Sequence, residues 1–101
     1  MPKNQIEPTA ELRSGFFERR RLRRIRMIVE LTLNLISSDM TVSYREARSL
    51  VACARKAILD LHPSFEERYE RVVAPHFEHI LCSRWPAEEA IHHAVATELV
   101  N

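Results

Sequence analysis

The chain has 101 residues, of which 46% are hydrophobic and 29% are charged, and its formal net charge is +1. This length allows one domain with a modest core, and the composition excludes wholesale disorder. The single glycine, Gly15, leaves little material for hairpin turns, so we expect one all-α domain spanning residues 1–101.

The net charge hides an uneven distribution along the chain. Residues 1–26 contain eight basic and three acidic residues, a net charge of +5, whereas the remainder contains seven basic and eleven acidic residues, a net charge of −4. This division predicts either pairing between the two parts or presentation of the basic part to a partner.

The first helix is expected from Phe16 to Ser37, after a frayed leader at residues 1–13 that includes Pro2 and Pro8. Its main apolar stripe consists of Leu22, Ile25, Val29, Leu33 and Ile36. A second apolar face consists of Ile28, Leu31 and Leu35. That face is buried if the helix lies centrally and otherwise needs a second copy, and we favour a homodimer.

Six arginines within residues 19–26 are the most distinctive motif. Helical spacing keeps most of them away from the apolar stripe, so we expect an exposed patch that consists of Arg19, Arg20, Arg23, Arg24 and Arg26. Three interpretations are open. The patch is a solvated face, with or without pairing to Glu66, Glu67 and Glu70 of the same chain, a surface for an acidic protein or anionic membrane, or a surface for nucleic-acid phosphates.

Two capping boxes predict where the next helices begin. The box at Ser43–Glu46 predicts a helix from Tyr44, and the box at Ser64–Glu67 predicts another from Phe65. The inward face of the second helix is expected to consist of Ala47, Leu50, Val51, Ala54, Ile58 and Leu61. The inward face of the third is expected to consist of Phe65, Tyr69, Val72, Phe77, Ile80 and Leu81.

Two prolines shape the second half of the chain. Pro75 either kinks the third helix or starts a new one, because proline lacks the hydrogen-bond donor of a helix interior. Pro86 marks the first turn of a last helix, whose stripe is expected to consist of Ala90, Ile91, Ala94, Val95 and Leu99. The predicted fold is a compact bundle of about four helices.

Histidines offer the one route to a metal or acid–base site. His76 and His79 lie on one ridge of the third helix, and a further ligand would come from His92 or His93. No zinc-binding motif or nucleophile context is present, and the helix dipole explains the acidic pair 88–89. We therefore expect no catalytic residue, no metal site and no cofactor, with a histidine-liganded metal protein as an alternative.

Cys53 and Cys82 occur without a CxxC motif, which predicts two reduced thiols in a cytoplasmic protein. No stretch of the sequence is long and apolar enough to span a bilayer. We expect a small non-enzymatic interaction or regulatory protein that presents its basic helix to an acidic protein surface. The main alternative is a nucleic-acid-associated protein that uses the same arginines.

Overall fold

A computed structural model describes residues 10–100, with side chains from residue 15 to residue 97. The elements in chain order are α1 (Ala10–Ser38), α2 (Tyr44–Leu61), a 3₁₀ turn η1 (Pro63–Phe65), α3 (Glu66–Arg68), a π-helical segment η2 (Tyr69–Val73), α4 (Ala74–Arg84) and α5 (Pro86–Val100). All are helical and residues 10–100 contain no strand, which confirms the all-α prediction.

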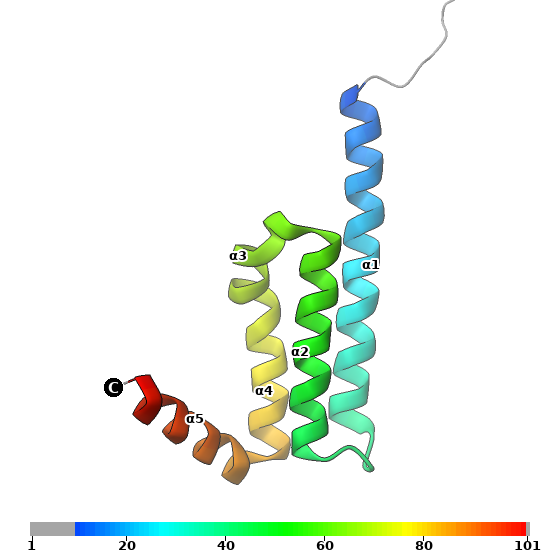
Figure 1. Cartoon of the computed structure of the whole chain (residues 1–101). Coiled ribbons are helices and arrows are strands. Elements are labelled where there is room, and N and C mark those ends of the chain that lie inside the picture. The colour runs from blue at the N-terminus through cyan, green and yellow to red at the C-terminus, as the bar shows by residue number, and fades with distance from the viewer. Residues whose placement is uncertain (1–9, 101) are drawn as a thin grey trace, which may run out of the picture.

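The core is a bundle of three helices, in which α1 and α2 run antiparallel and α4 packs against both (Figure 1). Its buried apolar residues are Ile25, Ile36, Ala47, Ala54, Ile58, Phe65, Tyr69, Val73, Phe77 and Leu81. The stripe predicted for the first helix is confirmed, because Ile25 and Ile36 are buried and Leu22, Val29 and Leu33 pack against the core. The stripe predicted for the second helix faces the same core.

Helix α1 is longer than the sequence predicted. It begins at Ala10 rather than Phe16, so residues 10–13 are helical and the predicted leader is shorter, while residues 1–9 lie outside the described part. The Nε2 atom of His62, just after α2, lies 2.9 Å from the carboxylate of Glu18. The part of α1 before Glu18 therefore extends past the end of α2 (Figure 1).

The start of α2 agrees with its predicted capping box. The Ser43 hydroxyl accepts a hydrogen bond from the Glu46 amide at 3.1 Å, and the Glu46 carboxylate accepts one from the Ser43 amide at 2.8 Å. Both bonds satisfy amides that would otherwise lack partners at the helix start, so Tyr44 is the first helical residue.

The second capping box is wrong. The helical path begins two residues earlier, at Pro63, and Ser64 makes no capping bond because its hydroxyl lies 3.1 Å from the Nδ1 atom of His62. Pro63 occupies the first helical position, where its missing amide hydrogen costs nothing.

From Pro63 to Arg84 the chain follows one helical path made of 3₁₀, α and π pieces, consistent with the predicted kink. The π segment ends just before Pro75, at the turn where proline would clash with the carbonyl four residues earlier in a regular helix. Its wide turn also shifts the inward face by one residue. Val73 is buried and Val72 is 48% exposed, so the inward position predicted for Val72 is wrong.

Helix α5 leaves the end of α4 and points away from the bundle (Figure 1). Every described side chain from Ala90 to Thr97 is exposed, including Ile91 at 65% and Val95 at 50%. The inward stripe predicted for this helix is therefore wrong over the described residues, and the side chain of Leu99 lies outside them. Among residues 10–100, no helix combines the length and apolar character needed to cross a membrane.

Candidate functional site

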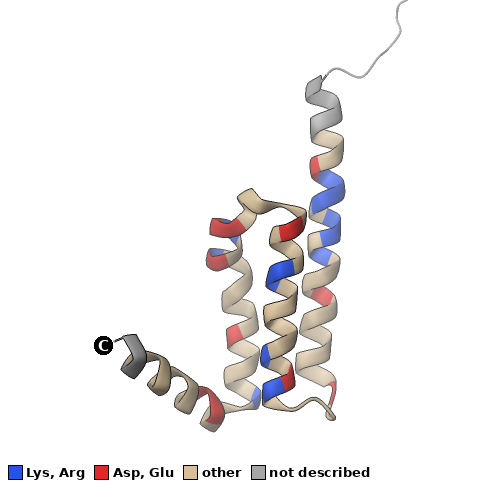
Figure 2. Ribbon diagram, viewed as in Figure 1, with Lys and Arg blue, Asp and Glu red and all other residues tan. Residues whose placement is uncertain are grey.

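The arginine patch lies on the part of α1 near the end of the bundle where α2 connects to α3 (Figure 2). All five predicted members, Arg19, Arg20, Arg23, Arg24 and Arg26, are exposed, whereas Arg21 is half-buried. They are exposed because the neighbouring Leu22 and Ile25 occupy the side of the helix that packs on the core.

The acidic residues of the third helix do not neutralise this patch. Arg55 of α2 pairs with Glu66 and Glu70 at 3.2 Å each, and Arg71 pairs with Glu67 at 3.6 Å. This result contradicts the interpretation in which those three glutamates pair with the arginine run.

Within the described residues, the run itself forms two ion pairs inside α1. Arg26 lies 3.0 Å from Glu30, with both side chains more than half exposed, and Arg21 lies 3.9 Å from Glu18. Such exposed pairs are worth about 0.5 kcal/mol or less, so they hold the arginines weakly. Most of the positive charge of α1 therefore faces solvent.

Large apolar side chains share this exposed side of α1. Phe16 is 48% exposed, Phe17 51%, Met27 66% and Leu31 59%. Because successive residues of a helix differ by about 100°, these four residues fall in one sector of about 100° together with two arginines. We call this sector the outward face of α1, and it consists of Phe16, Phe17, Arg20, Arg24, Met27 and Leu31.

A hollow of about 440 Å³ lies on this part of the helix, lined by Phe17, Arg20, Arg21 and Arg24. The Arg20 guanidinium also lies 5.9 Å from the centre of the Phe16 ring, in the range of a cation–π contact. The outward face thus offers cationic and apolar groups within one short stretch.

The residues predicted for self-association have different environments. Ile28 is half-buried and packs against the core of its own chain. Leu31 is exposed and Leu35 is half-buried, so only part of the predicted second apolar face is open to a partner.

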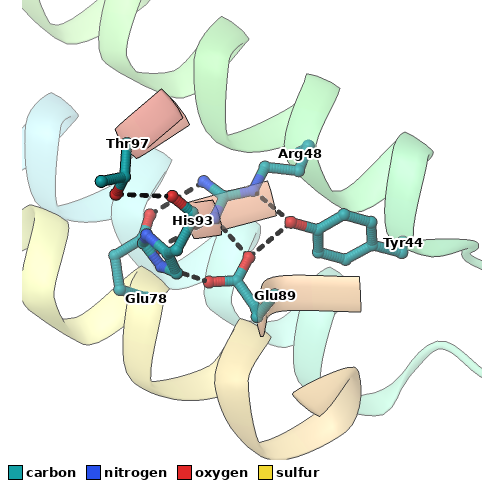
Figure 3. Close-up of polar contacts among 6 residues, drawn as sticks. All are labelled: Tyr44, Arg48, Glu78, Glu89, His93 and Thr97. Atoms are coloured by element: carbon teal, nitrogen blue, oxygen red, sulfur yellow. Dashed lines mark hydrogen bonds and ion pairs between the residues drawn. The ribbon is translucent and has the colours of Figure 1, made fainter. Parts of the chain in front are cut away.

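A second cluster joins α5 to the bundle, and we call Tyr44, Arg48, Glu78 and Glu89 the polar node (Figure 3). The Arg48 guanidinium donates two hydrogen bonds of 3.0 Å to the carboxylate of Glu78 and another to that of Glu89. The Tyr44 hydroxyl donates to Glu89 at 2.6 Å and accepts from Arg48 at 2.9 Å. The node therefore connects α2, α4 and the first turn of α5.

Glu89 is the buried member of the polar node, at 2% exposure. Burial alone would raise the pKa of its carboxyl, but the hydrogen bonds from Tyr44 and Arg48 outweigh burial and lower that pKa below its ordinary value. Burial likewise opposes the charge of Arg48, yet the hydrogen bonds to Glu78, Tyr44 and Glu89 raise its pKa. Both groups are therefore ionised at neutral pH.

The polar node contains the residues that could hold a metal ion, the alternative considered from the sequence. His76 and His79 are both exposed, and the group of possible ligands that the described residues bring together is instead Glu78, Glu89 and His93, within 4.8 Å of one another. Arg48 already pairs with both carboxylates, so a metal ion would have to displace its guanidinium. The node is arranged as an ion-pair network.

Comparison of the chain with protein-family models, curated proteins and solved structures finds no match.

Sequence reasoning missed the polar node. It explained Glu89 by the helix dipole and gave no role to Arg48. The sequence indicates only contacts within one helix at this site, because Tyr44 and Arg48 are four residues apart on one helix and Glu89 and His93 are four residues apart on another. The contact between these pairs spans more than 40 residues of sequence, and helical periodicity carries no information about it.

Proposed function

We propose that this protein is a non-enzymatic interaction module whose outward face of α1 binds an acidic, amphipathic segment of a partner protein. The observation that carries the proposal is the mixture of exposed arginines and exposed apolar residues in one sector of the helix. Guanidinium groups pair with carboxylates, while the apolar residues need apolar side chains on the partner.

The mixed character of this face favours protein over nucleic acid or membrane. A surface that contacts phosphates needs cations, and the exposure of Met27 and Leu31 adds nothing to such contacts. A membrane-inserting face keeps its centre apolar, whereas Arg20 and Arg24 lie in the middle of this sector by helical spacing. A partner that alternates acidic and apolar residues matches both features.

The proposal places the protein in the cytoplasm. Cys53 and Cys82 are both exposed and unpaired, and exposed thiols stay reduced in that compartment. The regulatory role that the sequence suggested remains part of this proposal, because binding without catalysis is how small helical modules act on their partners.

Fluorescence anisotropy with three labelled probes tests the binding proposal. The probes are a helix-forming peptide of glutamate and leucine, the same peptide with glutamine in place of glutamate, and a short DNA duplex. We expect the acidic peptide to bind most tightly, with an affinity that falls with salt. Tighter binding to the duplex would refute the proposal and support the nucleic-acid alternative.

Variants of the chain then assign the binding to α1. Arg20→Gln with Arg24→Gln should weaken acidic-peptide binding at least about tenfold, because two charge-assisted contacts of about 1 kcal/mol each are lost. Arg45→Gln with Arg71→Gln removes the same charge from exposed sites elsewhere and serves as the matched control. Equal losses in both variants would show a non-specific charge effect.

A further inference from the structure

We propose that the chain carries its own ligand for the outward face of α1, and that α5 of one copy binds this face on a second copy. The inference rests on the proposed function, because it assigns to α5 the acidic and apolar character expected of the partner. It differs from the dimer predicted through Ile28, Leu31 and Leu35, because Ile28 packs inside its own chain and only Leu31 of the three belongs to the outward face.

Helix α5 has an exposed apolar face over its described residues. Glu89 holds the helix to the polar node, and helical spacing places Ile91 and Ala94 on the opposite side. Ile91 and Val95 are exposed, and the neighbouring alanines let another helix approach closely. The buried ion pair holds one side of α5 against the bundle. The other side, which carries the apolar stripe, is open to a partner.

The charges of α5 and of the arginine run in α1 are opposite in sign. Glu89 is already paired in the polar node, which leaves Glu88 and Glu98 as the remaining acidic residues of 86–100, and this range contains neither lysine nor arginine. Residues 19–26 contain six arginines. Pairing two copies of α1 would bring like charges together, and pairing two copies of α5 would bury only short aliphatic stripes. The pairing of α1 with α5 is the combination that matches both charge and apolar surface.

Helix α5 and the amino-terminal part of α1 lie at opposite ends of the bundle (Figure 1). The outward face begins on the part of α1 that extends past the His62 end of α2, while α5 begins at the other end of the bundle, where Arg84 contacts the α1–α2 loop (Figure 1). The polar node directs α5 away from the bundle, so α5 does not meet the arginines of its own chain. The contact therefore has to form between copies.

Sedimentation velocity of the full chain tests this inference. We expect concentration-dependent self-association that weakens as salt is raised. An α1 variant, Arg20→Glu with Arg24→Glu, and an α5 variant, Ile91→Ser with Val95→Ser, should each weaken association at least about tenfold while keeping their helical content. Met40→Ser with Val72→Ser alters exposed apolar residues elsewhere and should change nothing.

A mixing experiment gives the sharpest result. The α1 variant keeps a normal α5, and the α5 variant keeps a normal α1, so the mixture should form a one-to-one heterodimer that neither variant forms alone. Failure of the mixture to associate, or a wild type that stays monomeric at low salt, would overturn the inference.

The same proteins separate this inference from the proposed function. The α5 variant retains the outward face of α1 and should still bind the acidic peptide. If it binds the peptide while the wild type is monomeric, the self-association inference fails alone. If the wild type associates as described but no variant binds the peptide, the proposal of an acidic partner protein fails.

Discussion

Replacing Arg48 by methionine tests whether the polar node sets the position of α5. Methionine keeps much of the volume and the helix propensity of arginine, so the change removes the guanidinium with little effect on α2. Glu89 then keeps its hydrogen bond from Tyr44 but loses its cationic partner inside a buried site. A buried carboxylate without that partner favours release of α5 into solvent.

The size of the effect follows from burial. Removing one partner of a fully buried ion pair costs about 3–5 kcal/mol, and the 23% exposure of the Arg48 side chain and the 40% exposure of Glu78 reduce this to about 2–3 kcal/mol. Release of α5 limits the loss of stability in the rest of the bundle, because Glu89 is solvated once the helix detaches. We expect α5 to lose hydrogen-exchange protection while the core of α1, α2 and α4 stays folded.

Circular dichroism and hydrogen exchange measure this outcome. A detached α5 is too short to be stable alone, so the helical signal should fall by up to the 15 residues of that helix. The double variant Arg48→Met with Glu89→Met removes both charges and should recover part of the loss. Unchanged protection of α5 in the single variant would refute the role of the node.

Three further predictions concern the helix starts, the pH dependence and the joint between α1 and α4. Ser43→Ala should lower the free energy of unfolding by about 1 kcal/mol, whereas Ser64→Ala should have little effect, and chemical denaturation distinguishes them. Because the pKa of the Glu89 carboxyl is lowered, its stabilisation of α5 is fully present above the ordinary value of 4.5 and is lost as the pH falls through the lowered value. Hydrogen exchange at acidic pH should therefore show that α5 is released before the whole protein unfolds. Loss of α5 already at neutral pH would contradict this prediction. Arg84→Met should cost about 1–3 kcal/mol, because Arg84 donates to the carbonyls of Ile36 at 2.8 Å and Asp39 at 3.1 Å, and an unchanged unfolding midpoint would contradict it.

Local sequence signals predicted the helices and most of the core. The stripe from Leu22 to Ile36 and the capping box at Ser43 depend on residues a few positions apart, and these are the patterns that helical spacing governs. Pro75 marked the irregular part of the third helix, although the sequence left open whether the helix is kinked there or a new one starts. The exposure of Val72 was not predictable, because Pro75 signals an irregular turn without showing that this turn is a π turn that shifts the register.

The exposed side of α1 was only half predictable. The arginine run is evident from the sequence, and the helical positions of these residues predicted their exposure. The exposure of Met27 and Leu31 depends on where α2 and α4 pack around α1, which is a tertiary property. The sequence therefore predicted a basic patch and, separately, an apolar face that includes Leu31, and the structure adds the exposure of Phe16, Phe17 and Met27 beside the arginines.

The polar nature of the node gives α5 a defined direction. Apolar contacts have no preferred angle, so a helix with an exposed aliphatic stripe and an apolar joint would be free to collapse onto the bundle. Hydrogen bonds require aligned donors and acceptors, and Glu89 receives them from Tyr44 on one side and Arg48 on another. Any rotation of α5 that covered Ile91 would strain or break these bonds and leave a buried carboxylate unpaired. The node thus stabilises the orientation in which the aliphatic stripe of α5 stays open, and this orientation is the one that the proposed contact with a second copy requires.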